Sequence, residues 1–172
     1  MVKPVALVTG GAGFIGSHVA QELINKGIEV IILDDLSGGF KRNIPASATF
    51  LKGSITDSGL IHELFTQHKI DYVFHLAAQS YPKTSFSAPL ETLQTNILGT
   101  ANLLEALRDY GEDDVVVHVC ASSEIFGRVP KDKLPIDEEC SIHPASPYAI
   151  SKVGTDLLGR YYAEAFGMTI MT

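Results

Sequence analysis

The sequence predicts an α/β fold in which helices flank a doubly wound parallel sheet. Short apolar segments alternate along the chain with longer segments that have helical spacing. The short segments are continuously apolar, which is the pattern of strands that are covered on both faces. Polar clusters at residues 9–16, 34–39 and 121–127 each follow such a segment, at the position where ligands bind in sheets of this kind.

The first half of the chain is predicted to hold four strands and two helices. The apolar run Val5–Thr9 ends in two glycines, and the helical pattern that follows it stops near Gly27. The predicted strands span residues 5–9, 30–33, 48–51 and 72–75, and the predicted helices span residues 13–26 and 58–67. Strands alternating with helices imply right-handed crossovers and parallel pairing.

The second half continues this alternation. Helices are predicted over residues 90–109 and 147–166, and strands over residues 115–119 and 169–171. A polar loop rich in proline separates the fifth strand from the last helix. Because the chain stops as its last strand begins, we expect one domain, residues 1–172, cut short before a further region.

Composition narrows the functional classes. Apolar residues make up 45% of the chain and charged residues 19%, which is enough to build a core. The net charge is −7 and the chain has no block of Lys or Arg, so we expect neither a nucleic-acid nor a membrane partner. Two cysteines and scattered histidines indicate a cytoplasmic setting and no metal site.

Three glycines between the first strand and the first helix predict a phosphate-binding turn. Gly10 allows a tight turn, Gly13 allows a pyrophosphate to approach the backbone, and Gly16 allows the helix to pack closely on the strand. The start of the helix then offers free N–H groups to a diphosphate. Asp34 at the end of the second strand can accept both ribose hydroxyls of an adenosine and repels a 2′-phosphate, which favours NAD over NADP.

The spacing Thr-Gly-x-x-Gly-x-x-Gly at residues 9–16 resembles that of the extended short-chain dehydrogenase/reductase superfamily, and specifically its nucleotide-sugar epimerases and dehydratases. The resemblance covers nearly the whole chain. It implies a Rossmann fold, the cofactor NAD, a nucleotide-sugar substrate and a small C-terminal substrate domain that this chain lacks. It also implies a homodimer through residues 90–109 and 147–166.

The resemblance assigns cofactor contacts to four further segments. These are the adenosine-ribose loop after Asp34, the segment 53–57, the wall after the fourth strand and a helix asparagine. The implied contacts are Phe14, Ile15, Asp35, Ser37, Gly38, Ser54, Ile55, Leu76, Ala77, Ala78 and Asn96. Ser54 stands where relatives usually carry the Asp that contacts the adenine.

Tyr148 and Lys152 form the second strong motif. Residues four apart share one face of a helix, so the Lys152 ammonium is expected beside the Tyr148 phenol. An unperturbed phenol has a pKa of about 10, and a neighbouring positive charge favours its ionised form. The pair could then take a proton from a sugar hydroxyl while a hydride leaves the same carbon, and both residues would also contact the cofactor.

Ser122 and Glu124 follow the fifth strand. Ser122 lies five residues before Gly127, as the active-site Ser or Thr of the family does, and could pass a proton to Tyr148. By the same resemblance Glu124 is the base that removes the sugar C5 proton in a 4,6-dehydratase. A Glu that faces solvent or caps the loop is the alternative reading.

Different motifs of the chain resemble different subfamilies, so the sequence leaves the reaction subtype open. Residues 121–127 and 75–80 resemble GDP-mannose 4,6-dehydratases and GDP-4-keto-6-deoxymannose reductases, whereas residues 9–18 and Asp34 resemble UDP-hexose 4-epimerases and dTDP-glucose dehydratases. We favour 4,6-dehydration of the GDP-mannose type, with epimerisation or 4-keto reduction as alternatives. A non-catalytic NAD-binding fragment is the rival hypothesis.

Four other residues receive no chemical role from the sequence. His18 and His75 flank the predicted cofactor region and are interpreted as packing residues, and His118 and Cys120 are interpreted as core residues of the fifth strand.

Overall fold

The computed structural model describes residues 3–110 and 114–172 of the chain. Six parallel strands form one sheet in the order β3-β2-β1-β4-β5-β6. The strands are β1 (Val5–Thr9), β2 (Glu29–Asp34), β3 (Thr49–Lys52), β4 (Tyr72–His75), β5 (Val116–Val119) and β6 (Thr169–Met171). This is the doubly wound Rossmann arrangement, and it confirms the predicted fold class.

The helices follow the predicted order with two differences. The longer helices are α1 (Phe14–Asn25), α2 (Ser58–Gln67), α5 (Gly99–Tyr110) and α6 (Pro147–Phe166), and the shorter ones are α3 (Pro82–Ser87) and α4 (Pro89–Leu93). Short 3₁₀ turns, η1 (Lys41–Asn43), η3 (Ser123–Phe126) and η4 (Lys131–Lys133), lie in the loops. Helix α3 was not predicted, because its polar, proline-started sequence reads as a loop.

The predicted helix over residues 90–109 is interrupted. A π-helical turn, η2 (Gln94–Leu98), joins α4 to α5 and places Asn96 at its centre. Such turns insert an extra residue and often occur at functional sites. The apolar pattern did not reveal this turn, because the leucines on both sides of it keep helical spacing.

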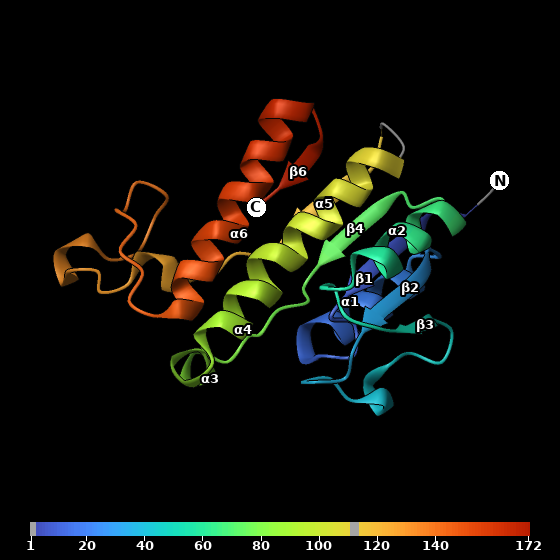
Figure 1. Cartoon of the computed structure of the whole chain (residues 1–172), viewed down its shortest axis with the longest axis horizontal. Coiled ribbons are helices and arrows are strands. Elements are labelled where there is room, and N and C mark those ends of the chain that lie inside the picture. The colour runs from blue at the N-terminus through green and yellow to red at the C-terminus, as the bar shows by residue number, and fades with distance from the viewer. Residues whose placement is uncertain (1–2, 111–113) are drawn as a thin grey trace.

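Helices cover the two faces of the sheet unevenly. Figure 1 shows α5 beside both α2 and α6, and the larger apolar core joins these helices to one face of the sheet. The second core joins α1 to the other face, mainly over β1 and β2. Helix α1 ends two residues before Gly27, whose backbone nitrogen donates to the Ile24 carbonyl and whose φ is +80°. This agrees with the predicted helix stop near Gly27.

The strand order places a switch point at the C-terminal ends of β1 and β4. The chain leaves β1 toward β2 on one side and leaves β4 toward β5 on the other, which is the position where ligands bind in sheets of this kind. No helix in the described residues is long and apolar enough to cross a membrane.

Candidate active site

The turn after β1 is built on close backbone contacts that only glycine allows. Gly10 has a φ of +71°, and a Cβ there would lie 2.8 Å from the backbone nitrogen of Ala77. A Cβ on Gly16 would collide with the carbonyl oxygen of Gly10, so α1 packs directly against the turn. The backbone nitrogen of Gly13 donates to that same carbonyl over 3.1 Å. The structure therefore holds the turn in one narrow shape.

The first turn of α1 is open to a ligand. Gly13 is its N-cap and supplies no side-chain cap, and the first turn carries no acidic residue. Phe14 and Ile15 are exposed by 80% and 59%. Since an uncapped helix start presents N–H groups and a partial positive charge, this end of α1 suits a diphosphate.

Asp34 ties the glycine turn to the loop after β2. One carboxylate oxygen accepts from the backbone nitrogen of Ala12 at 3.0 Å, and the other accepts from that of Leu36 at 2.8 Å. Leu36 has a φ of +66°, a strained conformation for a branched residue. Strain of this kind persists only where the surroundings impose it, and here the bond from the Leu36 backbone nitrogen to Asp34 is one such contact.

The remaining ribose-loop residues are exposed, and the two predicted contacts after β3 differ in burial. Asp35 accepts from the backbone nitrogen of Ser37 at 2.8 Å, and Ser37 and Gly38 face solvent. Ser54 is half-buried, whereas Ile55 is buried against α5 at Gly99.

Leu76, Ala77 and Ala78 follow β4 and are half-buried. The backbone nitrogens of Leu76 and Ala77 donate to the Thr9 hydroxyl, each over 3.2 Å, which fixes this segment beside the glycine turn. The predicted wall therefore lies against the turn.

Asn96 is fixed within the protein. Its side-chain oxygen accepts from the backbone nitrogen of Gln79 at 2.7 Å, and its amide group donates to the Gln79 carbonyl and to the Ser151 hydroxyl at 3.2 and 2.8 Å. Asn96 is only 1% exposed. These contacts link the segment after β4 to α6.

Helix α6 begins at the residues that carry the second motif. The Ser146 hydroxyl caps the helix by accepting from the backbone nitrogen of Ala149 at 3.0 Å, and Pro147 occupies the first turn. Tyr148 and Lys152 are both buried at the base of this helix. The Lys152 ammonium donates to the carbonyl of Cys120 at 2.8 Å, which places it at the end of β5.

The structure brings Ser122 to Tyr148. Ser122 starts the turn η3, where its hydroxyl accepts from the backbone nitrogen of Glu124 at 3.2 Å. Burial raises the pKa of the Tyr148 phenol, the hydrogen bond with Ser122 lowers it, and the charges of Cys120 and Glu124 raise it. Glu124 is exposed and lies close enough to Tyr148 for this effect.

The pKa of Tyr148 differs from the expectation. The sequence argument expected Lys152 to favour the phenolate, but among the groups of the chain burial has the larger effect and the pKa is raised. Burial also lowers the pKa of Lys152, against an opposing effect of Cys120. In both groups desolvation disfavours the charged form.

His75 is a residue to which the structure adds detail that the sequence did not show. It was interpreted as a packing residue and is indeed buried, and in addition both ring nitrogens form hydrogen bonds, at 2.8 Å to Thr9 and at 2.9 Å to Thr100. The sequence showed only a histidine at the end of a predicted strand. Its register with Thr9 of β1 comes from the folded sheet. Cys120 lies just past β5 and is half-buried, so it is not the strand residue that was expected.

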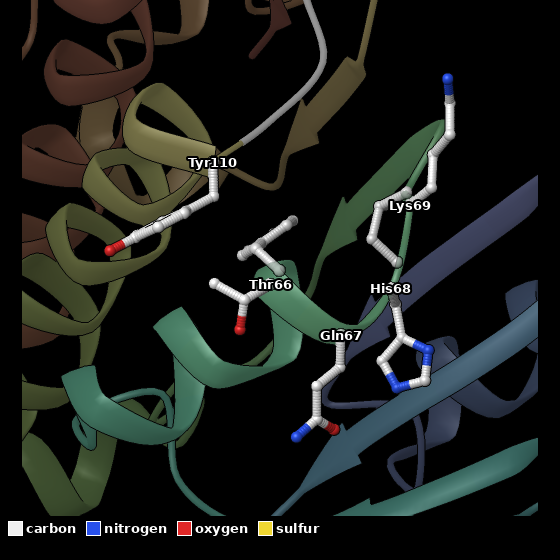
Figure 2. A pocket seen from close by; sticks show the side chains of 7 residues that line it. Thr66, Gln67, His68, Lys69 and Tyr110 are labelled. Atoms are coloured by element: carbon white, nitrogen blue, oxygen red, sulfur yellow. The ribbon is translucent and has the colours of Figure 1, made fainter.

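The described surface also carries a cavity of about 180 Å³ away from these residues. Figure 2 shows its lining, with Thr66 and Gln67 from the end of α2, His68 and Lys69 from the segment before β4, and Tyr110 from the end of α5. Because β4 starts after this segment, the cavity lies at the N-terminal edge of the sheet, opposite the glycine turn. None of the described residues that line it is a predicted site residue.

Comparisons with known proteins show the family to which the chain belongs. A family model described as GDP-mannose 4,6 dehydratase matches residues 7–172. The chain is 36% identical to a dTDP-glucose 4,6-dehydratase of Xanthomonas campestris, over 96% of this chain and 51% of the relative. The chain therefore belongs to the nucleotide-sugar epimerase and dehydratase family of extended short-chain dehydrogenases/reductases.

Solved structures show the same similarity. A UDP-glucose 4-epimerase of Thermotoga maritima with UDP-glucose has a TM-score of 0.89 and 39% identity, over 95% of this chain and 52% of that one. A UDP-glucose 4-epimerase of Thermus thermophilus in complex with NAD has a TM-score of 0.89 and 36% identity, over 96% and 53%. The chain thus spans about half the length of the relatives it matches.

Proposed function

We propose that this chain is the NAD-binding part of an enzyme that modifies a nucleotide-linked hexose by hydride transfer at sugar C4. The observation that carries the proposal is the grouping of Ser122, Tyr148 and Lys152 at the end of β5. Two strands away in the same sheet, β1 ends in the glycine turn. The similarity to epimerases and dehydratases supports the same class of reaction.

The residues at the switch point fit NAD. The turn at Gly10 and Gly16 leaves no room for side chains, and α1 starts without a side-chain cap, as a pyrophosphate site requires. Asp34 stands at the end of β2, and each of its oxygens retains lone pairs for a ribose hydroxyl. A buried carboxylate there disfavours the 2′-phosphate of NADP.

The roles of the chain's residues follow from their positions. NAD, when bound, supplies the hydride acceptor. Tyr148 exchanges a proton with the sugar hydroxyl. Ser122, which is hydrogen-bonded to the Tyr148 phenol, holds the same sugar hydroxyl in place. Lys152, anchored on the Cys120 carbonyl, places a positive charge beside the developing phenolate.

The reaction we favour is 4,6-dehydration, with Glu124 as the base that removes the C5 proton. Glu124 suits this role because it lies next to Ser122 and within electrostatic reach of Tyr148, whereas its exposure fits the alternative of a solvent-facing residue. The experiment incubates the enzyme of which this chain is proposed to be the NAD-binding part with GDP-mannose, UDP-glucose or dTDP-glucose, and follows the 4-keto-6-deoxy product. A Glu124→Gln variant should lose dehydration while hydride transfer persists. Dehydration that survives this change would remove Glu124 from the mechanism.

Epimerisation at C4 is the second candidate, because the structural relatives named above are UDP-glucose 4-epimerases. It needs hydride transfer out and back and no C5 base. In the same assay, conversion of UDP-glucose to UDP-galactose without a 4-keto-6-deoxy product would establish it over dehydration.

We further propose that the sugar-nucleotide pocket needs a region beyond the residues present here, because the chain spans about half of its relatives. Calorimetry with NAD⁺ and then with each nucleotide sugar tests this. Binding of NAD⁺ alone supports a cofactor-binding domain, and tight binding of a nucleotide sugar contradicts it.

A homodimer is a separate proposal. Exposed apolar side chains form stripes along α4, η2 and α6, at Leu90, Leu98, Ile150, Leu157 and Tyr161. Helices α4 and α6 pack against each other, so the stripes lie on neighbouring elements. Light scattering after size exclusion should show a dimer that Leu157→Asp converts to a monomer. Leu134→Asp, at an exposed residue after η4, is the matched control; a monomeric wild-type chain contradicts the proposal.

A further inference from the structure

His75 lies at the C-terminal end of β4 and is buried, with an exposed fraction of 3%. Its Nδ1 is 2.8 Å from the Thr9 hydroxyl on β1, and its Nε2 is 2.9 Å from the Thr100 hydroxyl on α5. The ring therefore bridges the strand that leads into the glycine turn and the helix that follows the π turn.

The neighbouring bonds determine which ring nitrogen carries the proton. Thr100 donates its single hydroxyl hydrogen to the Asn96 carbonyl, 2.6 Å away, so it can only accept from His75. Nε2 is then the protonated nitrogen, and Nδ1 accepts from the Thr9 hydroxyl. That hydroxyl has lone pairs left for the backbone nitrogens of Leu76 and Ala77. All of these contacts are satisfied by one arrangement of protons.

The surroundings favour this neutral ring. Burial lowers the pKa of His75 to about 3, and the charges of Lys152 and His118 act in the same direction. A neutral imidazole is both a donor and an acceptor, whereas a protonated one could not accept from Thr9.

The two ends of the bridge lead to different parts of the site. Thr9 directly precedes Gly10 and holds the segment after β4 against the glycine turn. At the other end the Asn96 amide donates to Ser151 of α6. The Thr155 hydroxyl of α6 lies 3.3 Å from the Asn96 carbonyl, although its shorter contact, 2.9 Å, is with the Ser151 carbonyl. Ser151 in turn donates to the backbone carbonyl of Tyr148 at 2.6 Å.

We propose that His75 is a positioning residue that couples the cofactor turn to the catalytic helix through its two hydrogen bonds, to Thr9 on one side and to Thr100 and the Asn96 carbonyl on the other. This inference rests on the proposed function, since it states that His75 fixes the position of the glycine turn relative to Tyr148. It gives the residue no contact with substrate and no share in proton transfer.

The first test is the tautomer of His75 in the wild-type chain, measured by NMR of ¹⁵N-labelled histidine. We expect a protonated Nε2 and an unprotonated Nδ1 that persist from pH 7 to pH 5. A ring that titrates near the ordinary value of about 6.5, or one protonated on Nδ1, would overturn the proposal. This measurement needs neither variants nor activity.

The second test separates the two bonds. In His75→Asn the amide oxygen takes the place of Nδ1 and preserves the bond from Thr9, and in His75→Gln the amide nitrogen takes the place of Nε2 and preserves the bond to Thr100. We expect His75→Gln to weaken NAD⁺ binding about tenfold and His75→Asn to leave it within about twofold, as measured by calorimetry. His68→Asn, in the segment before β4, is the matched control.

The Tyr148 side of the bridge has its own readout. With ¹³C-labelled tyrosine in the NAD⁺ complex, His75→Asn should shift the titration of Tyr148, and His75→Gln should leave it close to wild type. If His75 had only a structural role, the two substitutions would have the same effect. Equal effects of His75→Asn and His75→Gln therefore contradict the proposal. A wild-type chain that binds no NAD⁺ contradicts the proposed function, whereas normal NAD⁺ binding with no split between the variants contradicts only the role of His75.

Discussion

The residues of the glycine turn make contacts that leave no space for a side chain. Gly16 and Gly10 approach each other so closely that a methyl group cannot fit between them without moving the turn. Asp34 adds a second constraint, because its carboxylate accepts from the backbone of the glycine turn at Ala12 and from that of the loop after β2 at Leu36. Single-atom changes at these residues should therefore alter binding.

Gly16→Ala should abolish NAD⁺ binding, because its Cβ meets the Gly10 carbonyl and forces α1 away from the turn. The expected loss is at least about a hundredfold in affinity, measured by calorimetry. Gly59→Ala is the control, since its Cβ would have ordinary contact distances. Equal affinities of Gly16→Ala and wild type would show that the turn is not the binding site.

Asp34→Asn should shift the preference between cofactors. Removing the negative charge weakens binding of NAD⁺ and relieves repulsion of a 2′-phosphate, so the ratio of NADP⁺ to NAD⁺ affinity should rise about tenfold. The measurement is a pair of calorimetric titrations, with Glu29→Gln, an exposed carboxylate at the start of β2, as the control. An unchanged ratio would exclude Asp34 as the residue that discriminates.

Two elements, the π turn and α6, position the proposed catalytic group. The turn η2 directs Asn96 into the protein, where its amide holds the segment after β4 and Ser151 of α6 together. Helix α6 places Tyr148 in its first turn, directly after the Ser146 cap.

Ser146→Ala should destabilise the protein by about 1 kcal/mol, because the first turn of α6 loses its side-chain acceptor. Urea unfolding measures this difference, and Ser58→Ala at the exposed start of α2 is the control with little expected effect. No measurable change for Ser146→Ala would show that the cap contributes nothing to this helix.

At the scale of the whole molecule, stability should depend on pH through His75. Its pKa falls from the ordinary 6.5 to about 3 on folding, so between these values the unfolded chain binds a proton that the folded chain does not. This contribution is complete above about pH 6.5 and is lost as the pH falls toward 3.

We expect the free energy of unfolding to fall by about 2 kcal/mol through His75 when the pH is lowered from 7 to 5, because the unfolded chain gains a proton that the folded chain does not. Urea unfolding at a series of pH values measures the slope, and His75→Gln should reduce it by that amount. A slope that is the same in wild type and His75→Gln would mean that His75 does not cause it.

Part of the candidate site was predictable because its signals are local. The glycine spacing, Asp34 after an apolar run and the Tyr148–Lys152 pair four residues apart each lie within one short segment. Strand runs and helical spacing likewise predicted the six strands and the long helices in their observed order. The π turn escaped because its apolar residues match those of an ordinary helix.

The sequence by itself determined the alternation of strands and helices, the parallel sheet and the chemical groups offered at the strand ends. Only the tertiary structure decided that His75 joins Thr9 to Thr100, that Asn96 is held between Gln79 and Ser151, and that burial raises the pKa of Tyr148. The reason is physical. Hydrogen-bond partners 66 residues apart, and the loss of solvent around a phenol, come into being only when distant segments pack together.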